Sequence, residues 1–153
     1  MNTTASLPTP DQMSTHNGVE QLHTQVMAFT DEHGIDLFIF SRDGRILDSS
    51  VGPDRQPIEQ MAALCSALVN YSRGYSTVVN GAGVTRVVTR YGNGSVVLLP
   101  ISEVVWVGAM VARDQVIHAA HQLTLFTDQV AELVPHDIDQ SLQMVPTVLA
   151  EKG

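Results

Sequence analysis

The segment 57–73 limits the possible folds most, because it predicts a helix with more apolar surface than one core covers. Pro57 fits the first position of this helix, where a missing N–H leaves no hydrogen bond unmade. At 100° per residue, one wide side of the helix carries the apolar residues Ile58, Met61, Ala62, Leu64, Cys65, Ala67, Leu68, Val69 and Tyr71. The polar remainder is a narrow strip of Glu59, Ser66, Asn70 and Arg73. A helix on its own core needs an apolar stripe only about 100° wide, so a second surface must cover the rest.

A helix and two strands are predicted before this segment. Residues 18–33 have helical spacing of their large apolar residues, which are Val19, Leu22, Val26 and Phe29. Gly34 ends that pattern. Short apolar runs at 35–42 and 45–50 are separated by Asp43-Gly44, a dipeptide typical of a hairpin turn.

Three strands and a further helix are predicted after it. The β-rich runs are 84–91, 95–101 and 103–112, and Gly92-Asn93-Gly94 forms the first of their turns. Residues 114–134 return to helical spacing. Tight connections within both groups of strands favour an antiparallel sheet, with long crossovers only around the middle helix. The fold class is therefore α/β in the broad sense, with helices and an antiparallel sheet in one domain.

The run 104–111 is apolar at both parities, whereas a strand with one wet face alternates between apolar and polar residues. It is predicted to be a central strand with both faces covered. Trp106 and Met110 within it are interpreted as core residues rather than as contacts to a cofactor.

Composition narrows the class of protein. The chain has 153 residues, of which 44% are apolar and 16% charged, as expected for one globular domain. Its formal net charge of −8 has the wrong sign for binding nucleic acid through a broad field. The single Cys65 and the lack of a leader-like N-terminus favour a reducing cytoplasm. Apolar runs such as 104–112 are too short to span a membrane.

The two ends of the chain differ from the middle. Residues 1–17 are rich in Thr, Ser and Pro and have few large apolar residues, so we expect a flexible tail. Residues 135–153 carry only a weak helical stripe, interrupted by Pro146, so we expect partial order there. The folded domain is expected at 18–134.

No constellation of residues with the chemistry of an active site is found. His118 and His121 lie one helical turn apart, but a third metal ligand is missing, so a plain helix surface is the favoured interpretation. Cys65 falls on the apolar side of the middle helix, where a thiol packs as a small hydrophobe. Residues 81–83 begin like a dinucleotide-binding loop, but they precede a strand and lack the third glycine. We expect no catalytic residue, no cofactor and no metal.

The order of elements, together with three segments, resembles the roadblock family of dynein light-chain type. The segments are 37–49, 59–68 and 96–101, the last followed by 106–112. They contain a strand, an Asp-Gly turn, a strand and an alanine-rich helix in the family's order. The likeness covers about 18–134 and is greatest to bacterial members. The longer N-terminal tail and the bulky run 37–40 depart from the family pattern.

The resemblance implies a roadblock/profilin-like fold: a five-stranded antiparallel sheet with two helices on one face and the middle helix on the other. It also implies a dimer joined through the middle helices and an edge strand. An unpaired edge strand invites pairing with another chain, which agrees with a two-fold homodimer. The residues expected in the dimer interface are Leu64, Ala67, Leu68, Tyr71, Val84, Arg86, Val88 and Arg90.

Family members are non-enzymatic scaffolds or regulators, so the resemblance implies a protein that binds a small Ras-like GTPase or a signalling complex. No arginine is singled out as a residue that would stabilise GTP hydrolysis. The alternative is a ligand-sensing α/β domain with a cavity between helix and sheet. Such a domain would place polar groups inside apolar strands, and the run 104–111 has none.

Overall fold

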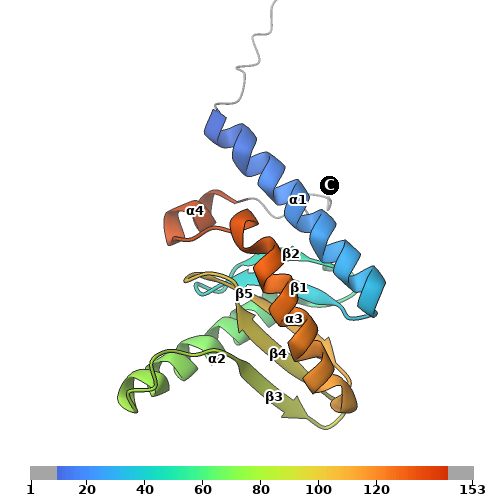
Figure 1. The fold of residues 1–153 in the computed structure, drawn as a ribbon, viewed down its shortest axis with the longest axis vertical. Helices are drawn as coiled ribbons and strands as arrows, with labels where there is room; N and C mark the ends of the chain where they lie inside the picture. The colour runs from blue at the N-terminus through green and yellow to red at the C-terminus, as the bar shows by residue number, and fades with distance from the viewer. Residues whose placement is uncertain (1–9, 145–153) are drawn as a thin grey trace, which may run out of the picture.

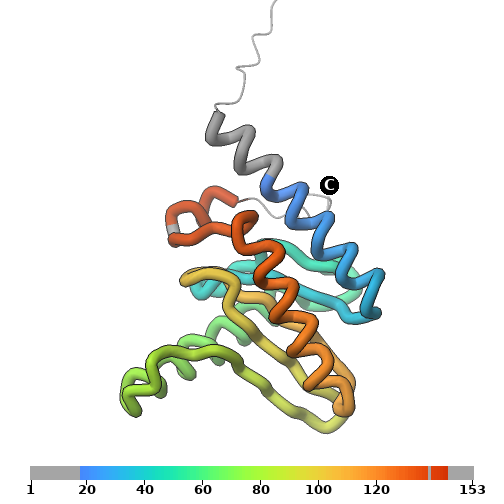
Figure 2. The backbone as a smooth tube through the Cα atoms, in the orientation of Figure 1, coloured from blue at the N-terminus to red at the C-terminus, as the bar shows by residue number. Residues whose placement is uncertain are grey.

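The computed structural model describes residues 10–144, with the side chains of 18–137 and 139–144 (Figure 2). In chain order the elements are α1 (Pro10–His33), β1 (Leu37–Ser41), β2 (Ile46–Ser49), α2 (Ile58–Val78), β3 (Val87–Tyr91), β4 (Gly94–Pro100), β5 (Val105–Val111), η1 (Arg113–Gln115), α3 (Val116–Val130), η2 (Ala131–Leu133) and α4 (Ile138–Gln143). The predicted succession of helices and strands is confirmed through α3. The helix α4 follows it.

The five strands form one antiparallel sheet in the order β2-β1-β5-β4-β3, as predicted (Figure 1). The strand β5 lies in the middle, and all its residues except Met110 are buried. Burial on both faces follows from the apolar residues at both parities of this strand. The two edges of the sheet are β2 and β3.

Helices cover both faces of the sheet, in the predicted two-plus-one arrangement. Figure 1 shows α1 and α3 on the near face and α2 on the far face. Successive strand residues point to opposite faces, so Leu37 and Ile39 of β1 join the core beneath α1 and α3. Phe38 and Phe40 join the core beneath α2, where Trp106 is also buried. The prediction of Trp106 as a core residue is confirmed.

The predicted Asp43-Gly44 hairpin turn joins β1 to β2. Gly44 has a φ of +93°, and its N–H donates to the Ser41 carbonyl at 3.0 Å. Partial burial acts against ionisation of Asp43, but hydrogen bonds from Ser41 and Arg45 and the Arg45 charge outweigh it. The pKa of Asp43 therefore lies below its ordinary value, and the carboxylate stabilises the turn.

The helices at the two ends of the domain differ from the predicted boundaries. Helix α1 begins at Pro10 rather than at Gly18. A nucleated helix gains one hydrogen bond for each residue added, so polar residues can extend it without apolar anchors. The predicted flexible tail 1–17 thus overlaps α1 at 10–17, and 1–9 lie outside the described residues. The C-terminal segment 135–153 contains α4, and 145–153 likewise lie outside.

The edge strand β2 is closed by its own side chains and by α1. Asp48 is buried, and one of its carboxylate oxygens lies 2.8 Å from Nδ1 of His23 in α1. The same oxygen accepts a hydrogen bond from the Ser49 backbone N–H at 2.8 Å. Because Ser50 N–H donates to Leu37 in β1, the neighbouring Ser49 N–H points outward. A donor that would otherwise be offered to another chain is therefore already bonded.

No helix in the described part of the chain has both the length and the apolar character needed to span a membrane.

Candidate functional site

Helix α2 buries one side against the sheet and leaves a second apolar side in solvent. Its buried face comprises Ile58, Ala62, Cys65, Ser66 and Val69. The predicted interface residues on the other side are exposed, with exposed fractions of 61% for Leu64, 38% for Leu68 and 82% for Tyr71, and Ala67 is exposed as well. The prediction that one core does not cover the apolar arc of this helix therefore agrees with the structure.

The same exposed side continues beyond the predicted end of the helix. The predicted helix ends at Arg73, immediately before Gly74, yet α2 extends to Val78. A glycine within a helix costs about 1 kcal/mol, which the flanking turns outweigh. The helix ends where the backbone becomes left-handed, at Asn80 with φ +55° and Ala82 with φ +62°. The prediction of a helix end at Gly74 was wrong.

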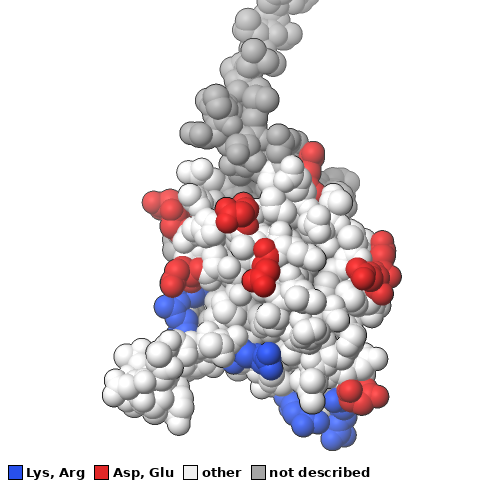
Figure 3. All heavy atoms as spheres, viewed as in Figure 1, with Lys and Arg blue, Asp and Glu red and all other residues white. Residues whose placement is uncertain are grey.

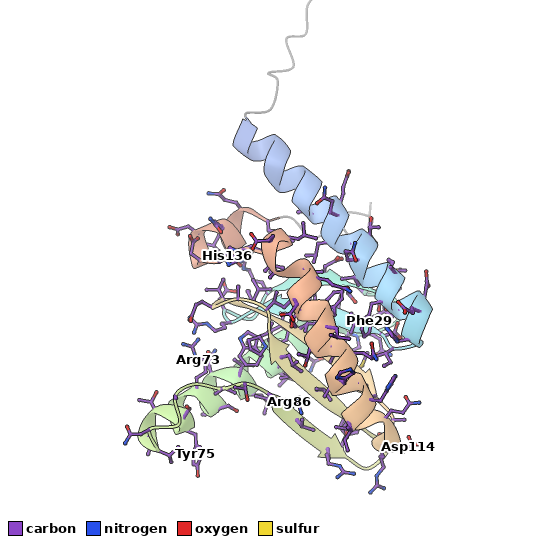
Figure 4. All side chains as sticks on the ribbon, viewed as in Figure 1. Phe29, Arg73, Tyr75, Arg86, Asp114 and His136 are labelled. Atoms are coloured by element: carbon purple, nitrogen blue, oxygen red, sulfur yellow. The ribbon has the colours of Figure 1, made fainter. Side chains whose placement is uncertain are left out.

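The extension adds two large exposed residues to the site, Tyr75 and Val78. They follow Tyr71 at intervals of four and three residues, which is the helical spacing that identified the rest of the arc. Figure 4 shows Tyr75 at the end of α2, which projects beyond the sheet. Continuing the periodicity through Gly74 would have found both residues.

The open edge of the sheet lies next to this helix end. The strand β3 begins at Val87, so Val84 and Arg86 precede it rather than belonging to it, contrary to the predicted strand 84–91. Val87 pairs with Leu98, two residues before Pro100. Because proline has no N–H for a ladder, the pairing does not extend further. Val88 and Arg90 lie within β3 and are exposed.

A groove of about 690 Å³ connects the end of α2 with the start of β3. Its lining includes Tyr71, Tyr75, Val79, Val84 and Arg86. It brings together three of the predicted interface residues, one from the helix and two from the segment before the strand. The exposed side of α2, this groove and the edge β3 together form one surface, which we call the α2–β3 surface.

The cysteine and the histidines singled out in the sequence do not lie on this surface. Burial raises the pKa of the Cys65 thiol to about 11, so it remains a neutral thiol at physiological pH. Among the described residues, no group of three potential metal ligands comes together. His118 is exposed on α3, where its ring packs 6.3 Å from the ring of His33. The α2–β3 surface therefore consists mainly of an exposed apolar helix face beside an open sheet edge.

Comparison with protein-family models matches residues 24–107 to the Roadblock/LC7 domain. Among solved structures, Myxococcus xanthus MglB is similar with a TM-score of 0.69 at 10% identity, over 76% of this chain and 92% of that one. A Roadblock/LC7 domain from Streptomyces avermitilis gives 0.63 at 16% identity, over 71% and 92%. The gliding protein MglB from Thermus thermophilus gives 0.55 at 12%, over 87% and 94%. No curated protein matches the chain significantly.

Proposed function

The chain belongs to the Roadblock/LC7 domain family, and we propose that it is a non-enzymatic homodimeric scaffold or regulator. Its partner is a small Ras-like GTPase or a signalling complex, and its compartment is the cytoplasm. The observation that supports the proposal most is the α2–β3 surface, where an exposed apolar helix face adjoins an open sheet edge.

The free energy gained by burying the exposed apolar residues of this surface favours its contact with a second copy of the chain. Five large apolar residues follow one another along α2 and remain outside the core, namely Leu64, Leu68, Tyr71, Tyr75 and Val78. Burying apolar surface lowers the free energy of the complex by about 25 cal/mol per Å². A standard interface buries about 800 Å² on each partner, which one helix face and one strand can supply.

The edge β3 offers the second part of the interface. Its outward N–H and C=O groups can pair with the same strand of a partner subunit, which forms a two-fold arrangement in which both copies use the same surface. The opposite edge, β2, is short, and the Asp48 carboxylate accepts a hydrogen bond from the Ser49 N–H while the Ser49 hydroxyl accepts one from the Val51 N–H that follows the strand. Pairing is therefore directed to β3.

Binding of a GTPase is supported by the family alone. A two-fold dimer presents each surface element twice, and a composite platform of this kind suits a protein that holds a partner without acting on it chemically. The buried, neutral Cys65 thiol agrees with a non-catalytic role.

The homodimer is tested by Leu64→Glu, with Glu59→Lys on the exposed polar side of α2 as the matched control. A carboxylate buried without a partner costs several kcal/mol, so Leu64→Glu is expected to give a monomer, and Glu59→Lys a dimer. Light scattering at micromolar concentration gives the mass, and circular dichroism establishes that each variant is folded. A monomeric wild type, or a folded Leu64→Glu protein that stays dimeric, contradicts the proposal.

The GTPase partner is tested by crosslinking in the native cytoplasm and recovery of the tagged chain. We expect a small GTPase whose binding depends on whether it holds GDP or GTP. Hydrolysis assays with the recovered GTPase then distinguish a regulator from a passive platform. Recovery of small molecules without any GTPase would favour a ligand-sensing domain instead.

A further inference from the structure

Three residues form a row along the open edge of the sheet, and the two within β3 project from its α1–α3 face. They are Arg86, Val88 and Arg90, all exposed, which we call the basic row. Val88 pairs with Val97 of β4, and Val97 belongs to the core beneath α1 and α3. Because directly opposite residues in a sheet share a face and side chains alternate along a strand, Val88 and Arg90 lie on the same side as these two helices. Arg86 precedes the strand and also lines the groove beside α2, so it lies where the row reaches that groove.

No helix covers the basic row within the described part of the chain. Helix α3 packs on β4 and β5, and the core beneath it includes no residue of β3. Figure 4 shows Arg86 beside β3 and clear of the α3 ribbon, and Figure 3 shows basic side chains along this border of the molecule, with an acidic side chain beside them at the corner where Figure 4 labels Asp114. Among the described residues, neither arginine of the row has a carboxylate at ion-pair distance.

The charge of this region is opposite to that of the protein as a whole. The stretch 60–102 contains none of the 16 Asp and Glu residues, and it contains three of the eight Lys and Arg residues. These are Arg73 and the two arginines of the basic row. Every Asp and Glu residue therefore lies outside β3, β4 and the part of α2 that follows its first turn.

We propose that the basic row binds an acidic, extended segment of a partner protein along the junction of two β3 strands. This inference rests on the proposed homodimer. When both α2 helices lie side by side on one face, antiparallel β3 pairing places Val88 and Arg90 of both copies on the other face, with Arg86 of each copy at the end of its row. Four guanidinium groups then lie along the strip formed by this junction.

The chemistry of the strip defines its occupant. Like charges on facing strands repel each other, and carboxylates laid along the strip remove that repulsion and form charge-assisted hydrogen bonds with the guanidiniums. A strand-like segment with an acidic side chain at every second position turns all its carboxylates to one face, so it can reach the arginines on both sides of Val88. The acidic remainder of each protomer repels a phosphate polymer or an anionic bilayer that would extend beyond the strip.

The probe is a fluorescein-labelled dodecapeptide of alternating Glu and Thr, compared with its Gln–Thr counterpart by fluorescence anisotropy. We expect saturable binding of the Glu–Thr peptide only, weakening as salt is raised. The double variant Arg86→Gln/Arg90→Gln should lose about tenfold or more in affinity, since bonds to charged groups are strong. The control is Arg55→Gln, which removes one exposed charge outside the row and is expected to bind as the wild type does; single Arg86→Gln and Arg90→Gln variants match it in charge.

Light scattering of the same samples separates the two proposals. A dimer that binds the peptide through Arg86 and Arg90 supports both. A dimer that binds both peptides equally, or is unaffected by the double variant, overturns the inference and leaves the homodimer standing. Arginine-dependent binding of duplex DNA or phosphatidylserine vesicles with no peptide binding also overturns it. A wild type that is monomeric even with bound peptide overturns the β3 junction together with the homodimer.

Discussion

The ring of Phe38 in β1 lies directly against Gly108 in β5, its register partner across the centre of the sheet. A Cβ atom at Gly108 would lie 2.3 Å from Cζ of Phe38, well inside van der Waals contact. Phe38 also stacks on Phe40, with ring centroids 5.7 Å apart. The core beneath α2 is therefore built on a position where only glycine fits.

We predict that Gly108→Ala lowers the free energy of unfolding by about 1–3 kcal/mol, the usual effect of overpacking a core. Phe38→Leu combined with Gly108→Ala should restore part of this loss, because the smaller side chain leaves room for the methyl group. Urea denaturation of the two single variants and the double variant measures the coupling. Strictly additive effects would show that the ring and the glycine do not constrain each other.

Gly74→Ala is expected to stabilise the protein by about 0.5–1 kcal/mol, because the position lies within α2 and has no neighbouring atom within 4 Å of an added Cβ. Gly34→Ala is the opposite case. Its φ of +66° after α1 disfavours a side chain by about 1–2 kcal/mol, so this variant should be less stable. Thermal unfolding at equal protein concentration compares the two. A destabilised Gly74→Ala protein would argue against a continuous helix through residue 74.

The thiol of Cys65 makes stability depend on alkaline pH. Its pKa is about 11 in the folded protein against 9.0 for an ordinary thiol. Between these values the unfolded chain has lost the proton that the folded chain retains, so the free energy of unfolding falls as pH rises from about 9 to 11. The contribution is fully present below pH 9. The difference between the wild type and Cys65→Ala across this range isolates the thiol from the tyrosines, and a difference that does not change with pH would contradict the expectation.

Arg45 donates a 2.6 Å hydrogen bond from Nη2 to the hydroxyl of Ser141, which joins the β1–β2 turn to α4. Ser141 is fully buried. We predict that Ser141→Ala speeds amide hydrogen exchange in residues 138–143 and changes the global free energy of unfolding by only about 1 kcal/mol. Thr124→Ala is the control, because its hydroxyl bonds within its own helix, to Ala120. Unchanged exchange in α4 would mean that this bond does not hold the helix.

The basic row predicts an unusual response of the homodimer itself. Each protomer carries −8, so removing two arginines increases the overall repulsion between copies. If Arg86 and Arg90 meet across the junction, their loss relieves a local repulsion that is stronger at short range. We therefore expect Arg86→Gln/Arg90→Gln to tighten the dimer about two- to fivefold at low salt, as measured by sedimentation. A weaker dimer would show that the long-range charge dominates.

The sheet was predictable because its information is local. Apolar residues at both parities of 104–111 identified the central strand, and the Asp43-Gly44 and Gly92-Asn93 turns fixed the hairpins. The exposed arc of α2 was predictable for the same reason, since periodicity alone shows how many apolar positions a helix has.

The features that the sequence alone did not predict depend either on a balance between opposing local preferences or on contacts between residues far apart in the chain. At Gly74 the intrinsic cost of a glycine favours a helix end, but the structure continues the helix to Val78, and sequence does not show which outcome prevails. The bond between Arg45 and Ser141 joins residues 96 positions apart and depends on the final packing of α4. The basic row needed the sheet order, because only the placement of α3 over β4 and β5 shows that β3 is left open.

The closed edge at β2 limits how many copies can assemble. A sheet that offers both edges can add subunits without end and grows into a fibre, whereas a sheet with one available edge stops after a single addition. The hydrogen bond from the Ser49 N–H to the Asp48 carboxylate thus helps to stop assembly after two copies. Loss of that carboxylate is therefore expected to change the length of the polymer that many molecules form more than it changes the stability of one molecule.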